Sequence, residues 1–210
     1  KVPGLGDEMP DFSVTLVDGS TFTLSEVLKE KQLVLINLWF SKCTPCRLEF
    51  PFMQAAWEKY RNQVSVVALS VDPSDTPDVI RDYMKDVRLA LPMGQDTPSL
   101  ANQFNPMGFP TSILVDRFGK IVYIGAGSIL DEGIFTSLFD QFLGDDYTET
   151  KVKDAVAKII EWITLDTSKD GLLYQWANGT YEWKYSKGAD KTVNTKDTVS
   201  SGTVMSKSNG

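Results

Sequence analysis

The stretch between residues 33 and 60 constrains the fold more than any other, because an apolar run, two cysteines and a helical pattern follow one another without interruption. Residues 33–38 have the length and the branched side chains of a buried strand. Residues 48–60 have the pattern of a helix. Cys43 and Cys46, which are the only cysteines, therefore lie at a strand-to-helix junction with two residues between them.

The position of these cysteines favours a reactive thiol. Unpaired N–H groups and the dipole at a helix N-terminus stabilise negative charge, so a cysteine placed there ionises more readily than a free one. Pro45 suits the first turn of such a helix, where its missing N–H removes no intrahelical hydrogen bond. Position and chemistry together predict dithiol–disulfide exchange.

Other uses of two cysteines fit this spacing less well. A disulfide across two residues closes too short a loop to stabilise the fold appreciably. A zinc site normally has four ligands, and this chain has no histidine and no third cysteine. Two inert buried thiols remain an open alternative. We therefore expect no metal and no other cofactor.

The composition limits the class of protein. A chain of 210 residues predicts one domain, or one domain with an appendage, and 42% hydrophobic residues suffice for a core. The net charge of −7 argues against a nucleic-acid partner. No stretch has the length of a membrane span, and no secretory signal opens the sequence. This is compatible with a cytosolic protein, or with one whose upstream signal or anchor has been removed.

The rest of the first 145 residues predicts a mixed α/β sheet. Asp18-Gly19, between residues 12–16 and 21–24, is a strong hairpin signal. We expect strands at 64–71, 112–115 and 121–124, an extended piece at 89–92, and helices at 25–28 (capped by Ser25), 78–87, 99–104 and 131–143. The last helix is expected to bury one face, formed by Ile134, Phe135, Leu138 and Phe142.

We expect a domain at residues 1–145 and an appendage at 146–210, separated near Gly144. Residues 152–163 carry a narrow apolar stripe with helical spacing, which we expect to pack on the main domain rather than on a membrane. Residues 186–210 form a tail rich in Ser, Thr, Lys and Gly. The sequence ends on the turn signal Asn209-Gly210, so we expect the natural protein to continue.

Residues 172–185 predict a β-hairpin around Asn178-Gly179. A two-residue loop would pair Trp176 with Tyr181 and Tyr174 with Trp183. An isolated hairpin is marginal in water, so it needs a partner surface. The partner is expected to be its own chain, and the alternative is an aromatic patch that binds sugar or protein.

Several motifs, taken in order, resemble the thioredoxin superfamily. Residues 1–145 look like the extracytoplasmic thiol–disulfide oxidoreductases of the TlpA and ResA type, within the AhpC/TSA-redoxin family. The matching motifs are Pro10-Asp11-Phe12, Asp18-Gly19, Leu24-Ser25, Leu35-Ile36-Asn37-Leu38-Trp39, Cys43-Thr44-Pro45-Cys46, Arg47-Leu48-Glu49-Phe50-Pro51 and Gly108-Phe109-Pro110-Thr111.

The resemblance implies a thioredoxin-like mixed central sheet flanked by helices, with an N-terminal β-hairpin. The expected C-terminal appendage of a helix and a β-hairpin lies outside the family pattern, and the resemblance says nothing about the hairpin. It implies that Cys43 attacks a substrate disulfide and that Cys46 then releases the reduced substrate. Glu49, one helical turn past Cys46, would tune the cysteines or relay protons, and its alternative is an ordinary exposed helix residue. Pro110 is expected to be cis. The expected substrate-binding residues are Lys42, Thr44, Pro45, Trp39, Phe109 and Pro110.

The chain departs from the family pattern at two positions. Asn37 stands where thioredoxins usually carry a buried aspartate, so that proton acceptor is missing. Lys42 stands where a tryptophan usually precedes the first cysteine. A cation there should stabilise the thiolate, but the flat aromatic contact surface is lost.

The resemblance implies a bacterial periplasmic or cell-envelope protein that reduces protein disulfides. Its electron donor would be a membrane thiol carrier, and its signal or membrane tether would lie outside this chain. One alternative is a non-catalytic binding protein that uses the aromatic hairpin. Another is a peroxiredoxin-like peroxidase, but neither cysteine has the threonine and proline that precede a peroxidatic cysteine. A copper chaperone of related fold would need a histidine.

Overall fold

The computed structural model describes residues 2–144, 172–177, 180–185, 196–199 and 203–207. Backbone contacts divide the chain into two units, Lys1–Phe139 and Asp140–Gly210. The predicted division into residues 1–145 and 146–210 stays a prediction. Within the described part of the chain, no helix combines the length and the apolar character that a membrane crossing requires.

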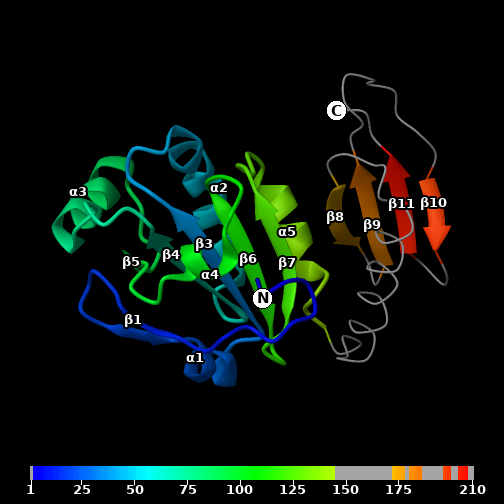
Figure 1. Cartoon of the computed structure of the whole chain (residues 1–210), viewed down its shortest axis with the longest axis horizontal. Coiled ribbons are helices and arrows are strands. Elements are labelled where there is room, and N and C mark those ends of the chain that lie inside the picture. Colours follow the sequence, from blue (N-terminus) through cyan, green and yellow to red (C-terminus); the bar gives the residue numbers. More distant parts are fainter. Residues whose placement is uncertain (1, 145–171, 178–179, 186–195, 200–202, 208–210) are drawn as a thin grey trace. The chain divides into compact units, whose positions relative to one another are not determined.

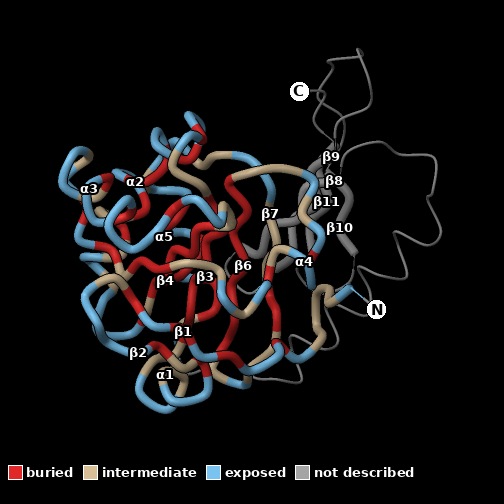
Figure 2. The backbone as a smooth tube through the Cα atoms, turned by 60° about the vertical axis from the view of Figure 1, so that its left-hand side comes forward, coloured by how far each residue is buried: buried red, intermediate tan, exposed pale blue. Residues whose placement is uncertain are grey.

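A five-stranded sheet in the order β5-β4-β3-β6-β7 forms the centre of the first unit (Figure 1). Strands β4 and β5 run parallel to β3, whereas β6 and β7 form an antiparallel edge. Every residue of β3 is buried, so the strand that leads to the cysteines crosses the middle of the core (Figure 2). The strands are β3 (Leu33–Trp39), β4 (Val64–Ser70), β5 (Met93–Gln95), β6 (Thr111–Asp116) and β7 (Ile121–Ala126).

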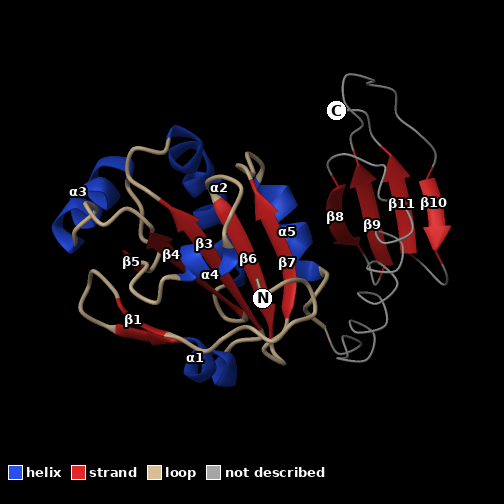
Figure 3. Ribbon diagram, in the orientation of Figure 1, coloured by secondary structure: helices blue, strands red, loops and turns tan. Residues whose placement is uncertain are grey.

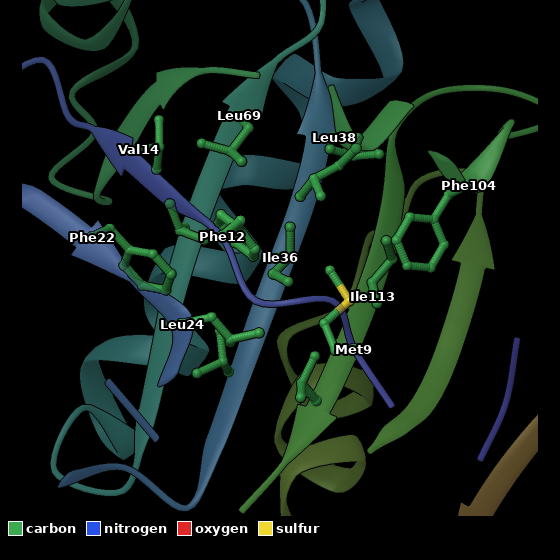
Figure 4. Close-up of a cluster of buried hydrophobic side chains, with 14 of the residues drawn as sticks. Met9, Phe12, Val14, Phe22, Leu24, Ile36, Leu38, Leu69, Phe104 and Ile113 are labelled. Carbon is green, nitrogen blue, oxygen red and sulfur yellow. The ribbon is translucent and has the colours of Figure 1, made fainter. Parts of the chain in front are cut away.

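The two faces of this sheet have different partners, because successive side chains of a strand point to opposite faces. On one face, Ile36 and Leu38 join an apolar cluster with the hairpin of β1 (Ser13–Thr15) and β2 (Thr21–Thr23), as Figure 4 shows. On the other face, Trp39 packs edge-on against Phe50 of α2. The sheet is thus covered on both sides (Figure 3).

Two of the helices, α2 (Thr44–Tyr60) and α3, begin at a residue whose side chain caps them. Thr76 caps α3 through its side chain, and Pro77 occupies the first helical position. The contact between Tyr60 and Phe139 joins α2 to α5 on the same face of the sheet. The helices are α1 (Leu24–Glu30), α2 (Thr44–Tyr60), α3 (Pro77–Val87), α4 (Leu100–Phe104) and α5 (Glu132–Asp140).

Three local predictions are wrong. Ser25 does not cap α1, because the helix begins at Leu24 and the Ser25 hydroxyl instead donates to Asp11 at 2.7 Å. The strand in this region does not lie at 89–92 but directly after it, as β5 (Met93–Gln95). In α5, Ile134 is 49% exposed and Phe139 is buried, so the apolar face is rotated relative to the prediction.

The second unit contains a four-stranded sheet in the order β10-β11-β9-β8. Strands β8 (Leu172–Ala177) and β9 (Thr180–Tyr185) are antiparallel and pair Trp176 with Tyr181 and Tyr174 with Trp183, which confirms the predicted hairpin register. The sequence predicted a tail where β10 (Lys196–Val199) and β11 (Thr203–Lys207) are found. The predicted helix at 152–163 and the turn signal at 209–210 lie outside the described residues.

Candidate active site

The two cysteines form a disulfide at the N-terminus of α2. Cys43 is the N-cap residue, and its Sγ accepts a hydrogen bond from the backbone N–H of Cys46 at 3.2 Å. Cys43 is 5% exposed and Cys46 is 1% exposed. Both cysteines are buried, and Cys43 is the more accessible of the two.

The surroundings of Cys43 favour a negatively charged sulfur. The amide of Cys46 points at its Sγ, and no acidic side chain lies in the first turn of α2 to repel a thiolate. Lys42, Thr44 and Pro45 flank it and are exposed. These three residues, which were expected to bind substrate, are thus accessible beside Cys43, and their binding role stays a prediction.

The loop before β6 lies beside the cysteine loop. The Phe109–Pro110 peptide bond is cis, which confirms the predicted isomer. The ring of Phe109 meets the ring of Phe40 edge-on, with a centroid distance of 5.7 Å. Phe40 also accepts the backbone N–H of Cys43 at 3.0 Å. One aromatic contact therefore holds the two loops together.

Glu49 lies one helical turn beyond Cys46 and is fully buried, so the alternative of an ordinary exposed helix residue is wrong. Its carboxylate accepts the side-chain amide of Asn37 at 2.9 Å and the backbone N–H of Ile129 at 2.7 Å. Burial outweighs these hydrogen bonds and raises the pKa of Glu49 to about 7. A carboxyl with this pKa can accept and release protons near neutrality.

Asn37, which replaces the usual buried aspartate, supports Glu49 instead of taking a proton. Its side-chain amide donates both to Glu49 and to the hydroxyl of Ser112 on β6, the latter at 3.1 Å. The sequence did not point to Ser112 or Ile129 as parts of the site. A polar residue within an otherwise apolar strand was the only available signal for Ser112, and a backbone amide such as that of Ile129 gives none.

Trp39 does not belong to a substrate-binding surface, and this part of the sequence prediction is wrong. Its side chain is fully buried. It packs against Phe50 and Tyr83, with centroid distances of 5.1 and 4.7 Å. The indole supports the base of the cysteine loop from below and has no exposed surface to offer a substrate.

Asp75 is a second buried carboxylate near the cysteines, and the sequence analysis did not identify it as part of the site. It is 1% exposed. It accepts the backbone N–H and the hydroxyl of Ser41 at 2.7 and 2.5 Å, and the hydroxyl of Ser70 at 2.5 Å. Because Ser41 is two residues before Cys43, Asp75 fixes the segment that delivers the nucleophile.

A hollow of about 220 Å³ lies where β4 and β5 end, and is lined by Ser70, Val71, Asp72, Pro73, Gln95, Asp96 and Thr97. Hydrogen bonds from Ser74 lower the pKa of Asp72, and the positive charge of Lys42 adds to this effect. Among the described residues, no group of three or more histidine, cysteine or acidic side chains is arranged to hold a metal ion.

Comparisons with known proteins agree with this geometry. The chain is 29% identical over 125 residues to the thioredoxin-like protein YneN of Bacillus subtilis, covering 59% of this chain and 72% of YneN. It is 32% identical over 120 residues to the thiol-disulfide oxidoreductase ResA of Bacillus cereus, covering 56% and 67%. A solved thiol:disulfide interchange protein of the thioredoxin family from Chlorobium tepidum superimposes with a TM-score of 0.58 at 28% identity, covering 67% and 99%.

The thioredoxin-like fold and the Cys43–Cys46 pair define an enzyme class, the thiol–disulfide oxidoreductases. The family model described as AhpC/TSA family matches residues 5–124, which is more than half of the chain. The protein therefore belongs to the AhpC/TSA family. The predicted fold class, family and enzyme class are confirmed.

Proposed function

We propose that this protein reduces disulfide bonds in other proteins, with Cys43 as the nucleophile, Cys46 as the resolving thiol and Glu49 as the proton acceptor. The observation that carries the proposal is the position of Cys43. It caps α2, receives an amide N–H on its Sγ, and begins the helix that carries the buried carboxyl of Glu49, whose pKa is about 7.

In the first step, the Cys43 thiolate attacks one sulfur of the substrate disulfide. The substrate S–S bond breaks, a mixed disulfide forms on Cys43, and the departing substrate sulfur takes up a proton. The helix N-terminus and the neighbouring Lys42 favour the thiolate that this step requires.

In the second step, Cys46 attacks the Sγ of Cys43. The Cys46 thiol passes its proton to Glu49, the Cys43–Cys46 disulfide forms, and the second substrate sulfur leaves and becomes a thiol. Two electrons have then moved from the enzyme to the substrate. Because Cys46 and Glu49 are both buried and one turn apart, the proton can move without crossing solvent.

The substrate is proposed to bind as an extended segment along the Phe109–Pro110 loop. The backbone of Phe109 would pair with it, as an edge does in strand addition. Lys42, Thr44 and Pro45 would form the opposite rim of this path, since all three are exposed beside Cys43. The edge-on contact of Phe40 with Phe109 keeps the two sides in register.

We propose an extracytoplasmic location, in the periplasm or cell envelope, with a membrane thiol carrier as electron donor. The resemblance to TlpA-type and ResA-type oxidoreductases supports both this setting and the reducing direction. Fractionation of cells that express the protein, followed by thiol trapping of Cys43 and Cys46, tests both points. A fully oxidised pair in cells that contain active thiol carriers would contradict the reducing direction.

Turnover of insulin disulfides with a thiol donor tests the proposed function. Cys43→Ser should abolish turnover, and Cys46→Ser should accumulate a mixed disulfide that is visible on a non-reducing gel. Unchanged turnover by Cys43→Ser would end the proposal. The reduction potential of the pair tests its direction, because a value near the oxidising extreme of the superfamily, about −120 mV, would identify an oxidant.

A further inference from the structure

Tyr123 and Gly125 on β7 form a pair in which one residue makes room for the other. A Cβ atom placed on Gly125 would lie 2.1 Å from the phenolic oxygen of Tyr123 and 2.6 Å from the ring carbon that bears it. The phenol ring therefore lies directly over Gly125. Any larger residue at this position would have to displace the ring.

An irregularity in the pairing of β6 with β7 decides which face of the sheet Tyr123 occupies. Val115 pairs with Ile121, but Leu114 pairs with Tyr123, so Val122 is one extra residue in β7. A shift of one residue moves every side chain that follows to the opposite face. Tyr123 thus leaves the face of the apolar cluster, to which Ile121 belongs, and joins the face of α2.

This face is the one that carries Glu49. Gly125 pairs with Ser112, and Ser112 pairs with Asn37, so one row of residues leads from the phenol to the amide that binds Glu49. Glu49 is also held by the N–H of Ile129, three residues beyond the end of β7. The phenol and the carboxyl therefore lie on the same face of the sheet, where α2 meets β3 and the segment after β7; the surroundings of the Glu49 carboxyl are called the Glu49 pocket below.

The electrostatics of the two groups agree with this placement. Burial raises the pKa of Tyr123 to about 12, and the negative charge of Glu49 contributes to the same shift. Tyr123 is half-buried. It stays protonated throughout the range in which Glu49 titrates.

We propose that Tyr123 closes the β7 side of the Glu49 pocket against water, in the space that Gly125 leaves, and acts as a positioning residue for the proton step. The proposal rests on the role proposed for Glu49 in resolving the mixed disulfide. In physical terms, the ring takes the place of water molecules that would otherwise solvate the carboxylate and favour its charged form.

The other groups around Glu49 do not account for this effect. Asn37 and the Ile129 amide donate to the carboxylate and therefore lower the pKa of Glu49. Near the start of α5, Asp131 is exposed and Glu132 pairs with Lys59. Cys46, one turn away on α2, is held in the disulfide, so Tyr123 is the remaining titratable group that we consider beside Glu49 in the oxidised protein.

The test measures the pKa of Glu49 by ¹³C NMR of its carboxyl group in the oxidised full-length protein, with Glu49→Gln to assign the signal. Tyr123→Ala should lower the pKa from about 7 towards the ordinary value of 4.5. Tyr123→Phe is the matched control, because it keeps the ring and should keep the pKa near 7. Gly125→Ala should lower the pKa by forcing the ring outwards.

Two results would overturn the proposal: an unchanged pKa of Glu49 in folded Tyr123→Ala, or an equal fall in Tyr123→Phe, which would assign the effect to the hydroxyl. If Tyr123→Ala does not fold, Tyr123→Leu and Gly125→Ala carry the same measurement. The turnover of Glu49→Gln tests the role of Glu49 separately. Full activity in that variant would refute the role of Glu49 in turnover, but it would not contradict the shielding of its carboxyl by Tyr123.

Discussion

Glu49 and Asp75 are both buried carboxylates within reach of the cysteine loop, yet their surroundings differ. Asp75 accepts three hydrogen bonds, all from two serines whose hydroxyls and amide point at it. Glu49 accepts two, from the amides of Asn37 and Ile129, and burial dominates its titration. The comparison indicates that similar burial can produce an anchor or a proton acceptor, depending on how many donors surround the group.

Of the variants that test this comparison, Glu49→Gln is expected to have the largest effect. General acid–base groups typically contribute roughly 10²- to 10⁴-fold, so resolution of the mixed disulfide should slow by at least about a hundredfold. In the native enzyme, the rate of this step should rise with pH through about 7, as Glu49 becomes able to accept a proton. Single-turnover kinetics should show this rise for the native enzyme and none for Glu49→Gln. An unchanged profile in the variant would make Glu49 a structural group, like Asp75.

Asp75→Ala should act on stability instead. It leaves the two serine hydroxyls and the Ser41 amide without their acceptor, and should lower the free energy of unfolding by about 3 kcal/mol. Urea denaturation measures this change. Asp75→Asn, which retains an acceptor oxygen, is the control and should cost less. A stable Asp75→Ala protein with a normal cysteine loop would remove the distinction between the two carboxylates.

The pH dependence of stability sharpens the comparison further. The pKa of Glu49 is raised above its unfolded value of 4.5, so the folded state favours the protonated carboxyl. The stability it contributes is present below about 4.5 and is lost as pH rises to about 7. Relative to Glu49→Gln, the native protein should lose about 2 kcal/mol between pH 5 and 8. Denaturation of both proteins at these two pH values measures the difference, and parallel curves would contradict it.

The smallest effect is expected outside both carboxylate sites. Truncation after Gly144 should leave dithiol activity largely intact, because the cysteines, Glu49 and the cis-proline loop all lie before it. The insulin assay on the folded truncate measures this. A severe loss of turnover would show that the segment with the aromatic hairpin contributes to the site.

The sequence predicted those parts of the fold that have strong local signals. The run before Cys43 is apolar enough to define β3, and Pro45 marks the first turn of α2. Strand β5 escaped prediction because Met93-Gly94-Gln95 has little strand preference and is extended only through its pairing with β4. Local strand propensity depends on neighbouring residues, so it cannot predict pairing with a strand that lies elsewhere in the chain.

The site was predicted in its covalent chemistry but not in its surroundings. The spacing of Cys43 and Cys46 and the position of Glu49 could be read directly from the sequence. Contacts such as Asp75 with Ser41 and Glu49 with Ile129 join residues that are 34 and 80 positions apart. Such pairs arise from the tertiary fold, and a backbone donor can be any residue, so neither leaves a pattern in the sequence.

Cys43 both starts α2 and carries out the chemistry, so the covalent state of its sulfur is coupled to the strength of a helix cap. An anionic sulfur accepts the Cys46 amide well, whereas a sulfur tied to a visiting protein is a neutral and weaker acceptor. The sulfur of the Cys43–Cys46 disulfide is neutral as well, so the start of α2 is best satisfied in the reduced enzyme. The helix cap thus favours the thiolate over both covalent states, and it stabilises the form of the enzyme that attacks a substrate.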